Sequence, residues 1–360
     1  MTIVRKTPAV AIVIINYFGI QDTLVCIESV MKSTYQGFQI FLIDNGSSQD
    51  QVEELSNLSR QNSKITFLPQ DTNLGFAEGN NVAMREILKL EKFKYIYFLN
   101  NDTVIDSNFL TPGITFLETN PTFGIVASTL IQFYNHNKLD NAGHELLNCL
   151  DMVPRGRNTS PNKYNIQSEV LGVCSAGALY RASTLRDIGD YDKEFFLNYE
   201  DADLSLRAIL YGHKCMYIPQ SIVFHKVNAS VNKARSYEYS LRSQFNMLKT
   251  ALYNIPTPVL IFDLPFFVLR DIITIFVTLI TGRWGITSVF IKARILCLQN
   301  LSDILATRKK NMKHKNISSW YYISHQKFFL TYYIKYTWDI YFKGRLSELE
   351  SHQAISKKIV

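Results

Sequence analysis

The sequence predicts an α/β protein, with a doubly wound, mostly parallel sheet in residues 1–232 and a mainly helical region in residues 233–360. First, apolar β-branched runs alternate with segments of helical spacing through the first hundred residues. Second, 360 residues that are 47% hydrophobic can bury a sizeable core. Third, the pattern changes after about residue 233, where long apolar segments and then basic ones follow.

Four apolar runs predict parallel strands, at residues 9–16, 39–44, 65–68 and 95–99. Helical spacing predicts helices between them, at residues 21–33, 49–61 and 77–90. This order is typical of a doubly wound sheet, whose ligands bind beyond the carboxyl ends of the strands. Asn16, Asp44 and Asp102 stand at such ends, so we expect a site there.

The middle of the chain is predicted to be richer in strands and less regular. Strands are expected at residues 124–133, 170–180, 214–218 and 222–225, and a helix opens near residue 200 and closes at Gly212. At the N-terminus, Arg5 and Lys6 precede an apolar run, but no small-residue cleavage site follows it. We therefore interpret this run as a buried strand and not as a signal peptide.

The C-terminal region combines apolar and basic segments. A helix is expected at residues 236–253, and residues 258–281 are long enough to span a bilayer, at roughly 20 residues. Four residues interrupt that stretch: Asp263, Pro265, Arg270 and Asp271. Because buried charges are costly in lipid, we expect an interfacial or re-entrant helix pair; the alternative is a buried helix of a C-terminal bundle.

Charge favours a membrane as the partner of this region. Residues 281–360 carry 14 Lys or Arg against 4 Asp or Glu. The basic run at residues 308–315 would meet anionic lipid, although a solvated loop is the alternative. Aromatic residues at 320–322 and 332–333 fit an interfacial belt or an ordinary core. No motif that reads nucleic acid accompanies the basic run, so we expect no nucleic-acid partner.

Composition excludes other classes of protein. Sixteen Gly and ten Pro are ordinary counts, and 23 Phe with 20 Tyr argue against a disordered chain. The five Cys lie far apart and form no CxxC pair, which favours a reducing compartment over a zinc ribbon or a disulfide scaffold.

Two motifs suit a nucleotide ligand. Asp44, followed by Asn-Gly-Ser-Ser, can accept a hydrogen bond from the imide of a base, or can simply end its strand in an Asx-turn. Residues 73–81 place two glycines at the start of a helix, where backbone amides favour phosphate. Their spacing is neither GxGxxG nor a P-loop.

Three further positions suit metal and acid–base chemistry. Asp102 can hold Mg²⁺ or Mn²⁺ on a diphosphate, but it needs a partner, and His225 at the end of a strand can provide one. Asp201 lies in the acidic start of a helix and is a candidate general base. The structural alternative is that these acids complement the helix dipole and that Asp203 pairs with Arg207.

Together these stretches resemble family 2 glycosyltransferases of the GT-A fold, most closely the rhamnosyltransferase type. The resemblance covers about residues 9–230 and rests on six stretches: IVIINYFGIQDTLVCIESV, FLIDNGSSQD, NLGFAEGNN, YFLNNDT, the run from GALYRAS to YEDADLSLRAILYGHK, and VFHKVNAS. Asn100-Asn101-Asp102 departs from the Asp-x-Asp of the family, which puts the affinity for the metal in doubt.

The resemblance implies a role for each motif. Asp201 would be the catalytic base, with Asp102 and His225 as the metal ligands. The nucleotide sugar would contact Asn16, Asp44, Gly75, Phe76, Gly79, Asn80 and Asn101.

These roles describe an inverting, metal-dependent glycosyltransferase. It would move a sugar from a nucleoside diphosphate donor to a polyprenyl-linked glycan in bacterial surface polysaccharide synthesis. The first candidate for the donor is dTDP-rhamnose. A UDP-hexose, a UDP-N-acetylhexosamine and UDP-galactofuranose are the alternative donors. We expect a peripheral protein on the cytoplasmic face of the plasma membrane, and a homo-oligomer is left open.

Two other functions are weighed against this one. A non-catalytic, glycosyltransferase-like scaffold subunit would explain the Asn-Asn-Asp departure. A nucleotidyltransferase would need a glycine-rich first loop that carries Lys or Arg, and residues 16–22 contain neither Lys nor Arg.

Overall fold

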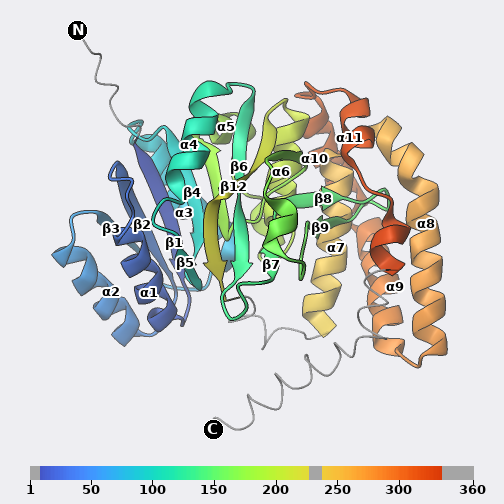
Figure 1. Cartoon of the computed structure of the whole chain (residues 1–360). Helices are drawn as coiled ribbons and strands as arrows, with labels where there is room; N and C mark the ends of the chain where they lie inside the picture. Colours follow the sequence, from blue (N-terminus) through green and yellow to red (C-terminus); the bar gives the residue numbers. More distant parts are fainter. Residues whose placement is uncertain (1–8, 227–236, 335–360) are drawn as a thin grey trace.

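A computed structural model of the chain describes residues 9–226 and 237–334 (Figure 1). Four sequence predictions fall wholly or partly outside these ranges: the N-terminal segment with Arg5 and Lys6, the end of the VFHKVNAS stretch, the proposed boundary after residue 232, and residues 335–360 of the basic region.

The described residues form one large sheet and a small hairpin. The strands are β1 (Val10–Asn16), β2 (Phe38–Asn45), β3 (Ile65–Gln70), β4 (Tyr95–Asn100), β5 (Thr103–Ile105), β6 (Phe123–Gln132), β7 (Leu139–Asn141), β8 (His144–Leu146), β9 (Met152–Pro154), β10 (Ser168–Val170), β11 (Gly177–Arg181) and β12 (Lys214–His225). The large sheet has the order β10-β12-β6-β11-β4-β1-β2-β3, and β5 and β7 add to β12 and β6. Strands β8 and β9 pair separately.

Most of the long strands run parallel. Strands β4, β1, β2 and β3 are parallel neighbours, as are β6 and β12. Strand β11 lies between β4 and β6 and is antiparallel to both. The sheet is therefore mixed, and the carboxyl ends of β1, β2 and β4 meet at one rim.

Helices cover both faces of the sheet. They are α1 (Ile20–Met31), α2 (Gln49–Gln61), α3 (Gly75–Lys89), α4 (Leu110–Thr119), α5 (Ala182–Ile188) and α6 (Glu200–Leu210), with short 3₁₀ turns at Pro161–Tyr164 and Lys193–Phe195. Alternate residues of β1 enter different cores, because side chains of a strand point to opposite faces. Val10, Ile12 and Ile14 pack with α1 and α4, whereas Ala11 and Val13 pack with α3 and α6.

Most of the expected elements are confirmed, and α2 has the predicted bounds. The two strands expected at 214–218 and 222–225 are wrong, because β12 is a single strand whose register with β6 shifts between Ile218 and Ile222. The strand expected at 170–180 is also wrong, because β10 ends at Val170 and β11 begins at Gly177. Neither β5, β7, β8 and β9 nor α4 and α5 were expected from the sequence.

Five helices follow the sheet: α7 (Tyr237–Asn254), α8 (Thr257–Ile280), α9 (Trp284–Gln299), α10 (Leu301–Met312) and α11 (Ser319–His325). In Figure 1 they lie beyond α6, on the side of the molecule away from β3, and α8 forms their outer edge. The helix pair expected within residues 258–281 is wrong, because α8 is one continuous helix that includes Pro265. Pro265 lies on the exposed side, where the carbonyl that it leaves unpaired can meet solvent.

Helix α8 buries polar side chains and exposes apolar ones. Asp263 and Arg270 are 0% and 1% exposed, whereas Ile272 and Phe276 are 59% and 63% exposed. This burial pattern is the reverse of that in an ordinary surface helix. Within residues 9–226 and 237–334, no helix is both long enough and apolar enough to cross a membrane.

The basic and aromatic segments divide between surface and core. Arg308 donates to the carbonyls of Leu252 and Ile255. Its guanidinium group therefore caps the C-terminal end of α7 and does not face outward. Lys309, Lys310, Lys313 and Lys315 are exposed. Trp320 is exposed, but Tyr322 is fully buried in the main core, so residues 320–322 are not a uniform aromatic belt.

Candidate active site

The rim of the sheet holds a network of side chains that starts at β1 and β2. Asn16, the last residue of β1, donates to Asp44 Oδ1 at 2.7 Å, because parallel pairing places these two residues opposite one another. Thr23 donates to Asn16 and accepts from Asn101, at 2.8 and 2.9 Å. Asp44 is fully buried and also accepts from the amide of Ser47. This hydrogen bond forms the Asx-turn that was the structural alternative for Asp44.

The glycine loop forms the start of α3 beside this network. Asn45 accepts from the amide of Leu74 and donates to the carbonyl of Gly75, at 3.0 and 3.1 Å. Gly79 and Asn80 are buried: a Cβ on Gly79 would lie 3.2 Å from Ile15, and Asn80 donates to the Phe76 carbonyl. Gly79 thus allows α3 to pack closely on β1, and Asn80 stabilises the first turn of α3.

Asp102 and His225 meet because β5 pairs with the end of β12. His225 lies opposite Thr103 in that pairing, and its Nε2 lies 3.2 Å from Asp102 Oδ1. On its other side, Nδ1 lies 2.9 Å from Asp140 Oδ2. Burial alone would lower the pKa of His225, but the charges and hydrogen bonds of Asp102 and Asp140 raise it to about 10.

These residues suit a hard divalent cation. A carboxylate and an imidazole nitrogen face each other, and a second carboxylate holds the other imidazole nitrogen, which is the usual support of a metal-bound histidine. Asp140 is fixed in turn: burial opposes ionisation, yet His225 and Arg157 hold the pKa of Asp140 below its usual value. The donor set fits Mg²⁺ or Mn²⁺ with substrate phosphates as further ligands, provided that the cation displaces the proton that Asp102 and Asp140 keep on His225.

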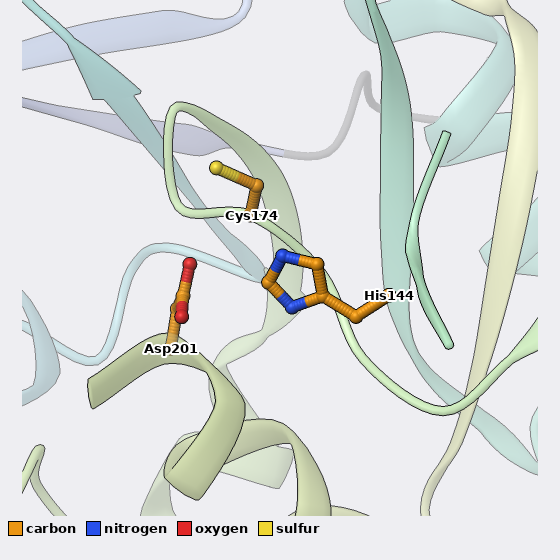
Figure 2. A group of neighbouring side chains, drawn as sticks. All are labelled: His144, Cys174 and Asp201. Carbon is orange, nitrogen blue, oxygen red and sulfur yellow. The ribbon is translucent and has the colours of Figure 1, made fainter. Parts of the chain in front are cut away.

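Asp201 lies in the first turn of α6 and faces two residues from other segments. One ligand atom from each of Asp201, His144 and Cys174 lies within 4.8 Å of the other two, and the three side chains converge in Figure 2. The amide of Ser175 donates to Asp201 Oδ2 at 3.4 Å. Burial lowers the pKa of His144, while the charges of Asp201 and Asp140 oppose that shift. His144 thus lies close to Asp201, and the charges of Asp201 and Asp140 both act on its imidazole.

The loop before Asp201 is strained and held by its neighbours. Phe196, Asn198 and Tyr199 have φ of 55°, 70° and 67°, which is rare for residues other than glycine. Asn246 of α7 donates to the carbonyls of Phe195, Leu197 and Asn198 at 2.9–3.2 Å. The loop is therefore held by the C-terminal helices.

The same loop contacts the glycine loop. The amide of Phe76 donates to the carbonyl of Phe196 at 2.7 Å. A Cβ on Gly75, whose φ is +80°, would lie 2.5 Å from the Phe196 ring. The ring of Phe196 thus covers Gly75, while Phe195 packs on Met247, Leu248 and Tyr253.

The other acids of α6 have structural partners or carry a proton. Arg207 pairs with Asp203 at 2.9 Å, as the spacing predicted. Glu200 is buried, and burial together with the charge of Asp201 raises its pKa to about 8. At neutral pH, Asp201 is therefore not flanked by a second full negative charge at Glu200.

The structure connects part of the expected site at one rim, whereas Asp201 contacts a separate set of residues, His144, Cys174 and Ser175. Asp44, Asn16 and Asn101 are joined through Thr23, and Asp102 follows Asn101 and contacts His225. The sequence analysis missed Thr23, Asp140, His144 and Cys174. Asp140 and His144 are four residues apart in an irregular stretch, so no periodicity singled them out.

Comparisons with known proteins support the same class. Residues 11–189 match the family model of glycosyl transferase family 2. A poly-beta-1,6-N-acetyl-D-glucosamine synthase from Staphylococcus epidermidis is 24% identical over 244 residues, which cover 64% of this chain and 54% of that protein. The chain spans about half or less of the length of the curated relatives that it matches.

Two solved structures share the fold. GalNAc-T7 with UDP, GalNAc and Mn²⁺ has a TM-score of 0.55 at 14% identity, covering 68% of this chain and 48% of that one. The mannosyltransferase PcManGT from Pyrobaculum calidifontis, with GDP-Man and Mn²⁺, has a TM-score of 0.52 at 12% identity, covering 86% of both chains. At such identities the likeness concerns the fold alone, and the expected GT-A fold is confirmed.

Proposed function

Because residues 11–189 of this chain belong to glycosyl transferase family 2, we propose that the protein moves a sugar from a nucleoside diphosphate to an acceptor hydroxyl with inversion. The observation that carries the proposal is the arrangement at the rim, where His225 lies between Asp102 and Asp140 at 3.2 and 2.9 Å.

The cation-binding group supports a nucleotide sugar as donor. Both structural neighbours are described with a nucleotide or nucleotide sugar and Mn²⁺. Asp102 and His225 would hold Mg²⁺ or Mn²⁺ here, with Asp140 orienting the imidazole. When bound, the cation would neutralise charge that develops on the departing diphosphate.

Asp201 is the proposed base. Its carboxylate would take the proton of the acceptor hydroxyl as that oxygen attacks the anomeric carbon. The new carbon–oxygen bond forms on the face opposite the diphosphate, the bond to the diphosphate oxygen breaks, and the configuration inverts. Phe76 and Asn101 are partly exposed and would contact the donor. Asn16 and Asp44 are fully buried, and Gly75, Gly79 and Asn80 are buried as well, so these residues would act by holding the shape of the rim and of the glycine loop.

The donor sugar is proposed from likeness alone. A dTDP-rhamnose remains the first candidate, on the resemblance of the motifs to rhamnosyltransferases. A UDP-N-acetylhexosamine is the second, because one relative is named a poly-N-acetyl-glucosamine synthase and one structural neighbour holds UDP and GalNAc.

The test uses the full chain with a panel of nucleotide sugars and Mn²⁺ or Mg²⁺. Nucleoside diphosphate should be released with a matching donor only when the metal is present. Asp201→Asn should lower turnover by about 10²–10⁴-fold while donor binding is kept. Asp102→Ala should weaken metal-dependent donor binding.

Asp187→Asn is the matched control, because Asp187 also pairs with a histidine, His213, but away from the rim. Near-normal turnover of Asp201→Asn would overturn the base assignment. No metal-dependent release with any donor would favour the scaffold subunit instead.

We propose a lipid-linked glycan as acceptor and an anionic membrane surface as partner, at the cytoplasmic face of the plasma membrane. The support is the apolar face of α8–α9, formed by Ile261, Phe262, Leu264, Val268, Leu269, Ile272, Ile273, Phe276, Leu279, Ile280, Trp284, Ile286, Ile291, Ile295 and Leu298, which are all exposed. Many large apolar side chains exposed on two neighbouring helices are typical of an interaction site. Exposed lysines on and after α10 suit anionic headgroups.

Flotation with vesicles tests this partner. The full chain should float with vesicles that contain phosphatidylglycerol, and less with neutral ones. The double variant Ile272→Glu/Phe276→Glu should reduce flotation, since burying each large apolar side chain contributes about 1.5–3 kcal/mol. Ile166→Glu is the control, because Ile166 is 75% exposed outside this face. Equal flotation of both variants would contradict the proposal.

A further inference from the structure

His144, Cys174 and Asp201 form a cluster that the proposed reaction uses only in part. The reaction needs Asp201, but it assigns no role to the imidazole of His144 or to the thiol of Cys174. One ligand atom of each residue lies within 4.8 Å of the other two, and the side chains come from β8, from the segment before β11 and from α6 (Figure 2). Nitrogen, sulfur and oxygen donors therefore face one space.

The backbone holds the three segments in place. The amide of His144 donates to the carbonyl of Gly172 at 2.8 Å, which fixes β8 two residues from Cys174. The amide of Val173 donates to Ser205 of α6 at 3.2 Å, and the amide of Ser175 donates to Asp201. The cluster is thus built into the fold and does not depend on mobile surface side chains.

An unpartnered nitrogen supports a ligand in this space. His144 is 8% exposed, and its Nδ1 is buried without a hydrogen-bond partner among the described residues. Leaving such a group unsatisfied costs about 1–3 kcal/mol. Because burial lowers the pKa of His144, its imidazole is neutral at pH 7 and can offer a lone pair to a cation.

We propose that His144, Cys174 and Asp201 bind a thiophilic divalent cation of the Zn²⁺ class, separate from the Mg²⁺ or Mn²⁺ group at Asp102 and His225. Three protein ligands and one water make a common four-coordinate zinc site. Thiolate and imidazole select Zn²⁺ over Mg²⁺ and Mn²⁺, which prefer oxygen. On binding, the Cys174 thiol gives its proton to solvent and the sulfur bonds to the cation.

The site has a consequence that rests on the proposed function. Asp201 cannot accept the proton of an acceptor while its carboxylate ligates a cation. Zinc should therefore inhibit sugar transfer that Mn²⁺ supports, without displacing Mn²⁺ from Asp102 and His225.

Cobalt provides a readout that does not depend on turnover. Titration of the full chain with Co²⁺ should produce tetrahedral d–d absorption and a thiolate-to-cobalt charge-transfer band, and Zn²⁺ should abolish both. Cys174→Ser should remove the charge-transfer band. His144→Gln should weaken cobalt binding by more than about tenfold, because loss of a direct ligand should cost at least as much as loss of an outer-shell partner.

Cys297→Ser is the control, because Cys297 lies on α9 and should leave both bands unchanged. A wild-type spectrum without a thiolate band overturns the site, as does a band that persists in Cys174→Ser. In the transfer assay, Cys174→Ser should raise the zinc concentration for half-inhibition by about tenfold or more. If no donor is turned over, the proposed function fails, and the cobalt titration still decides the site.

Discussion

His225 lies between two carboxylates, which fixes the orientation of its ring. Nε2 faces Asp102 and Nδ1 faces Asp140, at 3.2 and 2.9 Å. A group that holds the far nitrogen of a metal ligand typically changes metal affinity about 10–100-fold when it is removed. On the proposed function, Asp140 would be a positioning residue for the metal and would not itself touch the donor.

The first prediction concerns Asp140→Asn. We expect the Mn²⁺ concentration for half-maximal nucleotide binding to rise about 10–100-fold, because an amide holds the imidazole less firmly than a carboxylate does. A Mn²⁺ titration of nucleotide binding measures the change, and Asp187→Asn, at the other His–Asp pair, should not show it. An unchanged titration would exclude Asp140 from the metal group.

The second prediction concerns Asp263, whose carboxyl is fully buried on α8. Burial raises its pKa to about 7, and the hydrogen bond from Gln326 opposes the shift only in part. Above about pH 4 the unfolded chain gives up this proton and the folded protein keeps it. Stability should therefore fall between about pH 4 and pH 7 and stay low above that range.

We expect Asp263→Asn to remove this decline and to raise the free energy of unfolding at about pH 8 by up to about 4 kcal/mol. The new amide can also donate to Gln326 Oε1, which is buried without a partner among the described residues. Chemical denaturation at several pH values measures the effect, with Asp303→Asn on exposed α10 as control. A variant that follows the wild-type pH profile would contradict the prediction.

At the scale of elements, the loop from Phe195 to Tyr199 depends on α7. Asn246 donates to three of its carbonyls, and three of its residues have positive φ. Loss of the Asn246 contacts would remove three of the hydrogen bonds that hold this strained conformation next to Asp201.

The third prediction is that Asn246→Ala destabilises the protein by about 1–3 kcal/mol and lowers kcat more than it raises KM for the donor. The reason is that Asn246 holds the loop next to Asp201, the proposed base, whereas the glycine loop at Leu74 and Gly75 keeps its hydrogen bonds to Asn45. Asn300→Ala is the control, because Asn300 donates a single exposed bond at the end of α9. Equal losses in both variants would contradict a specific role for Asn246.

The sequence predicted best those strands and helices whose hydrophobic pattern is not interrupted by proline, glycine or charged residues. The apolar runs of β1 and β2 are unambiguous, because strands covered on both faces need continuous apolar sequence. Pro112 and Gly113 lie inside α4, which was not expected, and β12 was expected as two strands although the sheet keeps it whole. The charges within residues 258–281 led to the expectation of a helix pair, whereas α8 is one helix that buries Asp263 and Arg270.

The site was predictable to a similar extent. Strand ends and motif order brought out Asp44, Asp102, Asp201 and His225. Asp140 and Cys174 were not predictable, because Asp140 lies on a three-residue strand that shows no pattern of its own, and Cys174 meets His144 and Asp201 only in the folded chain.

At the scale of the whole molecule, the C-terminal helices complete the core of the sheet. Ala251, Ile255, Val259 and Tyr322 belong to the same apolar cluster as β1 and α6. Asn254 also donates to buried Asp203 at 2.7 Å. The boundary expected after residue 232 lies outside the described residues, but the elements on either side of it share one core.

The fourth prediction is that residues 1–232 expressed alone fail to form a stable domain. Removing the helices would expose the apolar face of α6 and leave Asp203 with one partner fewer. Cooperative unfolding monitored by circular dichroism, compared with that of the full chain, is the measurement. A truncated protein with the same midpoint of unfolding would show that the sheet folds independently.

The hydrogen bond between the amide of Phe76 and the carbonyl of Phe196 has a kinetic consequence. A donor bound beside Phe76 would lie against the loop that leads to Asp201, and would so complete the surface that the acceptor meets. We therefore expect a compulsory order, with the nucleotide sugar arriving first and the nucleoside diphosphate leaving last. Product inhibition by that diphosphate should be competitive toward the donor and not toward the acceptor.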